Sequence, residues 1–140
     1  MPRGWPKQPA RHALAAQGIK TTRGPPLGPA IRALGETVRQ DYSPAERDRE
    51  AEFDRKIEKR FNLPAETLKE IYFEVEIAAY DEGGGPDNQD RKGALALIHD
   101  PKWFEAISGD LARMYGKTED DQKRITDFLY TMYHVRKVAR

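Results

Sequence analysis

The stretch Leu68-Lys-Glu-Ile-Tyr-Phe-Glu-Val-Glu-Ile-Ala-Ala-Tyr80 decides the fold of this 140-residue chain, because it fits two kinds of secondary structure. With a helical period, the apolar residues at positions 68, 71, 72, 75 and 79 fall on one face. With a period of two, the apolar residues at 73, 75 and 77 alternate with Glu74 and Glu76, which is typical of a half-buried strand. The Pro64-Ala-Glu start and the Ala78-Ala79 pair favour a helix. Such a helix is apolar most of the way round, so we expect it to be the central one.

Start signals for further helices occur on both sides of this stretch. Ser43-Pro44-Ala45-Glu46 has the pattern of a capping box, and Asp100 and Thr118 are further N-cap residues. Apolar residues at helical spacing lie after each signal, and also before the first one. They are Ile31, Leu34 and Val38; Phe53, Ile57 and Phe61; Phe104, Ile107, Leu111 and Met114; and Ile125, Phe128, Leu129, Met132 and Val135. The sequence therefore predicts an all-α protein, a small helical bundle of about five to six helices.

The charges of the chain are divided between two unlike parts. The 24 basic and 23 acidic residues give a net charge of +1, yet residues 1–35 hold six basic residues and no acid. Residues 36–140 hold 18 basic and 23 acidic residues, a net charge of −5, and six of the ten prolines lie before position 30. Because proline and like charge oppose compaction, we expect residues 1–27 to form an extended, flexible, basic, Pro-rich N-terminal arm. Residues 28–140 are expected to form a single helical domain.

One local pattern within the arm predicts order. Pro9–Gln17 fits a short helix that ends at Gly18, with Leu14 and Ile19 placed to touch across the helix end. So short a helix is not stable alone in water, so we expect it to fold on a partner or on the body of the protein. The pattern Trp5…Arg11-His12-x-x-Ala15-x-x-Gly18-Ile19-Lys20-Thr21 resembles basic leader segments of uncharacterised phage and other mobile-element reading frames. That resemblance implies no particular activity.

The residues of the arm are the candidate binding residues, because basic side chains neutralise phosphate and apolar ones enter protein grooves. The candidate nucleic-acid or partner-binding residues are Arg3, Trp5, Lys7, Arg11, His12, Leu14, Ile19, Lys20 and Arg23.

Motifs of enzyme, cofactor and metal sites are missing from the sequence. There is no phosphate-binding glycine motif, no H-E-x-x-H and no cysteine. The acids of the Asp81–Asp90 stretch, a glycine-rich turn that begins at Asp81, lack the spacing of a calcium loop. His99 and His134 have no recognisable catalytic partner nearby, and Glu74 and Glu76 point to different faces of a helix, which makes a poor carboxylate pair. We therefore expect no catalytic residue, no metal and no cofactor.

The last two predicted helices are joined by Gly116-Lys-Thr118, a connection of the length found in helix-turn-helix motifs. The second helix would meet DNA with three consecutive acids, at positions 119–121, which phosphate repels. An antiparallel helical hairpin is therefore favoured. The acids at the start of the last helix, and the basic residues at 136, 137 and 140 at its end, match the helix dipole.

Two classes of function are consistent with these features. In the first, a non-enzymatic helical scaffold is anchored by its basic arm to nucleic acid or to a nucleoprotein assembly. In the second, the protein is an adaptor or regulator whose arm, with Trp103, Tyr130 and Tyr133, docks on a partner protein, and which can be a homo-oligomer. No apolar run approaches the roughly 20 residues of a membrane-spanning helix, so we expect no membrane partner and a cytoplasmic location.

Overall fold

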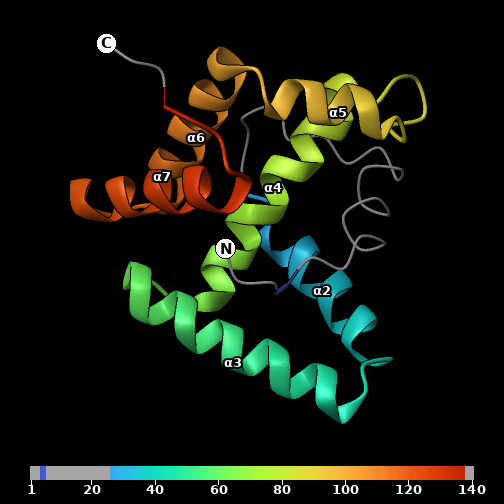
Figure 1. Ribbon diagram of the computed structural model, residues 1–140, viewed down its shortest axis with the longest axis vertical. Coiled ribbons are helices and arrows are strands. Elements are labelled where there is room, and N and C mark those ends of the chain that lie inside the picture. The colour runs from blue at the N-terminus through green and yellow to red at the C-terminus, as the bar shows by residue number, and fades with distance from the viewer. Residues whose placement is uncertain (1–3, 6–25, 138–140) are drawn as a thin grey trace.

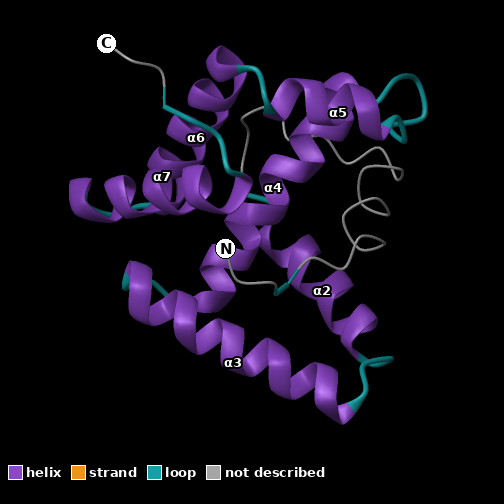
Figure 2. Cartoon of the chain, in the orientation of Figure 1, coloured by secondary structure: helices purple, strands orange, loops and turns teal. Residues whose placement is uncertain are grey.

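A computed structural model describes residues 4–5 and 26–137 of the chain (Figure 1). These residues form six helices and no strand, as Figure 2 shows. The helices are α2 (Gly28–Arg39), α3 (Pro44–Phe61), α4 (Ala65–Gly83), α5 (Arg91–Ile98), α6 (Pro101–Tyr115) and α7 (Glu119–Tyr133). The prediction of an all-α protein with about five to six helices is confirmed for this part of the chain. The predicted helix over residues 9–17 lies outside the described residues, and the flexibility of the arm stays a prediction.

Helix α4 is the central element, as its apolar pattern predicts. It runs through the middle of the molecule, with α3 across one end and α5 along the other, and it contacts each of the other five helices (Figure 1). Leu68, Ile71 and Val75 are fully buried. The strand alternative for this stretch is wrong, because the whole stretch is helical; Glu74 and Glu76 are buried as well.

The helices begin where their sequence signals predict. The Ser43 hydroxyl accepts a hydrogen bond from the backbone N–H of Glu46, whose side chain accepts one from the N–H of Ser43, so the capping box is complete. The side chains of Asp100 and Thr118, as predicted, and of Asp90, which was not predicted, accept hydrogen bonds from backbone N–H groups in the first turns of α6, α7 and α5. These caps satisfy backbone donors that have no partner within the helix, and they fix where each helix starts.

Aromatic rings fill the space between α4, α6 and α7. Phe104 and Phe128 are fully buried, and the rings of Tyr72 and Tyr133 are stacked with their centroids 4.6 Å apart. The Tyr133 hydroxyl donates to the backbone carbonyl of Tyr72 at 2.6 Å. The polar end of Tyr133 is therefore satisfied inside the core, and the α6–α7 hairpin is held against the middle of α4.

The turn between α4 and α5 starts later than predicted. Asp81, Glu82 and Gly83 still belong to α4, and the chain leaves the helix at Gly84. Gly83 and Gly93 explain the close packing of α4 and α5, because a Cβ at residue 93 would collide with the carbonyl oxygen of Gly83. The turn itself serves to fold α5 back onto α4.

The end of α7 corrects a second expectation. The helix stops at Tyr133, and His134 takes a left-handed conformation with a φ of 55°. Arg136 and Lys137 therefore follow the helix, so its last turn contains no basic residue to match the dipole. Lys137 instead pairs with Asp127, with its Nζ 2.9 Å from Oδ1. Among the described helices, none is both long enough and apolar enough to cross a lipid bilayer.

Candidate functional site

Trp5 is a core residue of this fold, although it lies within the predicted arm. Its side chain is 6% exposed and lies against the rings of Phe53 and Phe128, whose centroids are 5.0 and 5.8 Å away. Its indole N–H donates to Oδ1 of Asp54 on α3 at 2.7 Å. We call the residues that contact Trp5, namely Phe53, Asp54, Tyr72 and Phe128, the Trp5 seat. An indole with both its ring and its N–H accommodated is a firm attachment point for the chain.

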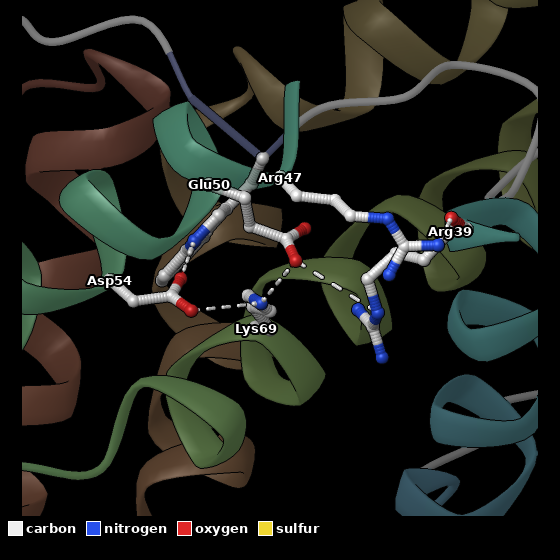
Figure 3. A network of polar contacts seen from close by, with 6 residues as sticks. Arg39, Arg47, Glu50, Asp54 and Lys69 are labelled. Atoms are coloured by element: carbon white, nitrogen blue, oxygen red, sulfur yellow. Dashed lines mark hydrogen bonds and ion pairs between the residues drawn. The ribbon is translucent and has the colours of Figure 1, made fainter. Parts of the chain in front are cut away.

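A chain of charged groups that includes Asp54 joins α2, α3 and α4 (Figure 3). Lys69 of α4, whose side chain is only 7% exposed, lies 3.3 Å from Oδ2 of Asp54 and 3.5 Å from Oε1 of Glu50. Glu50 also lies 3.9 Å from Nε of Arg39, and Arg47 donates to the backbone carbonyl of Arg39 at 2.8 Å. A buried lysine is tolerated when carboxylates match its charge, and here there are two.

A pocket of about 30 Å³ lies beside Lys69. Its lining includes Trp5, Arg39, Tyr42 and Phe73. A space of this size holds about two water molecules, whereas cofactors and drug-sized ligands need several hundred Å³. The pocket therefore does not support a cofactor or substrate site.

Two glutamates one turn apart on α4 form a second polar centre, the carboxylate pair Glu70–Glu74. Their exposed fractions are 3% and 0%. Arg32 of α2 donates to Oε1 of Glu70, and the hydroxyl of Tyr115 on α6 donates to Oε2 of Glu74. Among the described residues, Oε1 of Glu74 has no hydrogen-bond partner. A buried oxygen without a partner is costly when the carboxylate is charged.

Burial raises the pKa of Glu74 to about 7, although hydrogen bonds from Tyr115 and from the backbone of Leu27 act in the opposite direction. Burial also raises the pKa of Glu70, against the opposing effect of Arg32. The pKa of the Tyr115 hydroxyl is raised by burial and by its bond to Glu74, so this tyrosine acts as a hydrogen-bond donor. The pair therefore gains or loses a proton near neutral pH.

The structure describes one of the predicted binding residues of the arm, Trp5, and places it in the core. The others lie outside the described residues: Arg3, Lys7, Arg11, His12, Leu14, Ile19, Lys20 and Arg23. Of the aromatic residues expected to dock on a partner, Tyr133 is 9% exposed, while Trp103 and Tyr130 are partly exposed. His99 and His134 are exposed. In the described part of the chain, no three His, Asp or Glu side chains gather as a metal site would require.

The carboxylate pair was not predicted from the sequence, because the alternating pattern of residues 73–77 relates Glu74 to Glu76 and not to Glu70. The signal was present, since two glutamates at positions i and i+4 repel each other on a helix and are seldom placed on its most apolar stretch. The partner of Trp5 carried no such signal. Asp54 is one of many charged residues of α3 and lies 49 positions away from Trp5.

Comparison with protein-family models, with curated proteins and with solved structures finds no match to this chain. What the protein does must therefore be inferred from its own charges and contacts.

Proposed function

We propose that this protein is a non-enzymatic helical scaffold that attaches to nucleic acid, or to a nucleoprotein assembly, through the basic residues near its N-terminus. The observation that carries the proposal is the division of charge, since residues 1–35 hold six basic residues and no acid while the rest of the chain has a net charge of −5. Such a segment is attracted to a phosphate backbone, and the acidic body is repelled by it. Binding is then confined to one segment of the chain.

The contacts of Arg32 reduce the number of charges available for phosphate. Arg32 donates to the buried Glu70, and it is the one cation that faces Glu70 among the described residues. The charge of Arg32 is therefore already paired. Five basic residues then serve the proposed contact: Arg3, Lys7, Arg11, Lys20 and Arg23. With all five engaged on duplex DNA, the logarithm of the affinity falls against the logarithm of salt concentration with a slope of about −4.5.

The placement of Trp5 supports contacts to the phosphate backbone rather than to the bases. Single-strand binding uses aromatic rings as stacking platforms, and the ring of Trp5 is buried against Phe53 and Phe128. Trp5 and Leu27 both lie on the helical body. Four of the five basic residues fall between them in the sequence, so both ends of this basic segment are attached to the body.

A salt-titrated binding assay tests this proposal. Fluorescent duplexes of unrelated sequence are titrated with the full chain and with a variant in which the five basic residues listed above for phosphate contact are replaced by Gln. We expect similar losses of affinity on every duplex and a salt slope close to zero for the variant. The matched control removes five exposed basic residues of the body and should keep the slope. They are Arg55, Lys59, Arg91, Lys102 and Lys117.

Docking on a partner protein is the second candidate, and the sequence of the arm favours it at one point. Leu14 and Ile19 are spaced to touch across a helix end, which contact with phosphate does not require. If the arm enters a protein groove, Leu14→Ala and Ile19→Ala weaken binding strongly, because each buried side chain contributes about 1.5–3 kcal/mol. The charge substitutions would then change mainly the association rate. That pattern, with duplex binding unaffected by the five Gln substitutions, would reject the nucleic-acid proposal.

A further inference from the structure

We propose that Glu74 is a buried proton site, and that loss of its proton loosens the first turn of α2 from α4. The inference concerns the body of the protein and does not depend on what the arm binds. It starts from the position of the carboxylate pair Glu70–Glu74 directly beneath the start of α2, the helix that begins at Gly28.

The start of α2 is built against this pair. A Cβ at residue 28 would lie 2.5 Å from Oε2 of Glu70, so the first residue of α2 lies directly against this carboxylate. The N-cap residue Leu27 provides no side-chain cap, and the first turn of α2 contains no acidic residue. Instead, the backbone of Leu27 is close enough to Glu74 to act against the rise of its pKa, and Arg32 in the next turn pairs with Glu70. The two buried glutamates of α4 thus lie against the start of α2.

The charges around the pair do not balance when both glutamates are ionised. Arg32 faces the pair from α2, Tyr115 faces it from α6 as a neutral hydroxyl, and Glu66 adds a further negative charge on α4. One arginine then opposes two buried carboxylates, and Oε1 of Glu74 has no hydrogen bond in the described structure. A proton on Glu74 removes this imbalance. Burial accordingly raises the pKa of Glu74 to about 7.

Helix α2 is the element that can yield when Glu74 becomes charged. It packs on α4 through a small apolar cluster of its own, in which Ile31 and Ile77 are the buried residues. Tyr115, on the other side of Glu74, belongs to α6, which packs on α4, α5 and α7 together. Water therefore reaches Glu74 at less cost when the start of α2 lifts than when α6 moves. Once solvated, Glu74 returns to the ordinary glutamate pKa.

The direction of the pH dependence follows from these two protonation states. The closed form holds the proton up to about pH 7, whereas the open form releases it near its ordinary pKa of 4.5. The opening equilibrium constant of α2 therefore rises with pH, by up to tenfold per pH unit between pH 5 and pH 7, and levels off above that range. The contribution of the Glu74 proton to the stability of the closed form, relative to the open form, is fully present below pH 4.5 and is lost as pH rises through 7.

Hydrogen exchange on the full chain tests the proposal. Protection of the α2 amides, corrected for intrinsic exchange rates, is measured from pH 5 to pH 8. In the unaltered protein we expect α2 protection to fall by tens of fold between pH 5 and pH 7, with α6 and α7 changing less. Glu74→Gln keeps the neutral form at every pH, so α2 protection should stay at its low-pH level. The exposed-residue control Glu58→Gln should leave the pH dependence unchanged.

A second variant keeps the test decisive if Glu74→Gln does not fold. Tyr115→Phe removes a hydrogen bond that lowers the pKa of Glu74, so the fall in α2 protection should move to higher pH. Corrected protection of α2 that is constant from pH 5 to pH 8 would overturn the proposal. So would an unchanged pH dependence in Glu74→Gln, or equal changes in all helices, since these would assign the effect to other groups or to global unfolding.

Discussion

Replacing Trp5 by alanine should lower the free energy of unfolding by about 3–5 kcal/mol, the range for loss of a buried tryptophan. The side chain of Trp5 is 6% exposed. The substitution removes its contacts with the rings of Phe53, Tyr72 and Phe128, whose centroids lie 5.0, 6.4 and 5.8 Å from that of Trp5. Its hydrogen bond to Asp54 is also lost, which adds about 1–2 kcal/mol. A contribution of similar size stabilises the variant, because residue 5 has a left-handed backbone with a φ of 60°. This backbone strain is relieved when the alanine at residue 5 is no longer held in the core.

Two further variants separate the contributions of the ring and the indole N–H. Trp5→Phe retains an aromatic ring but removes the bond to Asp54, so we expect a loss of about 1–2 kcal/mol. Trp103→Phe is the matched control, since Trp103 is partly exposed and its indole donates to the exposed Glu82 at 3.2 Å. Its loss should stay below about 1 kcal/mol.

Urea unfolding followed by far-UV circular dichroism measures all three variants. Because the chain has two tryptophans, the Trp103→Phe protein also reports on Trp5 by fluorescence, and its emission should be that of a buried indole until the main transition. If Trp5→Ala unfolds at the same urea concentration and with the same slope as the unaltered protein, Trp5 is not a core residue. The Trp5 seat would then have no part in holding the fold.

Two other changes test local interactions. Ser43→Ala should lower thermal stability by about 1 kcal/mol through loss of the capping box, while Ser43→Gly should cost only a few tenths, as measured by calorimetry. Arg32→Gln should cost about 1–2 kcal/mol at neutral pH, because it leaves Glu70 without its facing cation, although solvent screens the half-exposed arginine. This loss should disappear in urea titrations below pH 4, where Glu70 is protonated; an equal loss at pH 3.5 and pH 7 would contradict the pairing.

Local features of this fold could be predicted from the sequence because they depend on residues a few positions apart. The capping box joins Ser43 and Glu46, and the stripe of Phe53, Ile57 and Phe61 needs only the helical period to be recognised. Each of these residues behaves in the structure as its pattern predicts. The central position of α4 can be predicted in the same way. Its surface is apolar on most sides, and one neighbouring helix is too narrow to cover such a surface.

The Trp5 seat could not be predicted on this basis. The charge and proline content around Trp5 indicate an unstructured segment. Composition describes a whole segment, however, whereas a contact with the core is made here by a single residue, Trp5. The burial of Glu70 and Glu74 was hidden for a related reason. A glutamate at helical position i+4 is ordinarily exposed, and its burial here depends on α2 and α6 packing over it. Arg32 and Tyr115 are 38 and 41 positions away from their glutamates.

Lys69 and Glu70, neighbours on α4, hold the two ends of the segment that contains most of the basic arm residues. Lys69 lies 5.9 Å from the ring centroid of Trp5 and pairs with Asp54, so its charge supports the attachment before the segment. Glu70 pairs with Arg32 and lies against the first residue of α2, which is the attachment after it. The two attachments depend on charges of opposite sign, and the pH dependence proposed for Glu74 acts on the Glu70–Glu74 side. Loosening of the start of α2 therefore changes the attachment after the segment and leaves the contacts of Trp5 with Phe53, Phe128 and Asp54 in place.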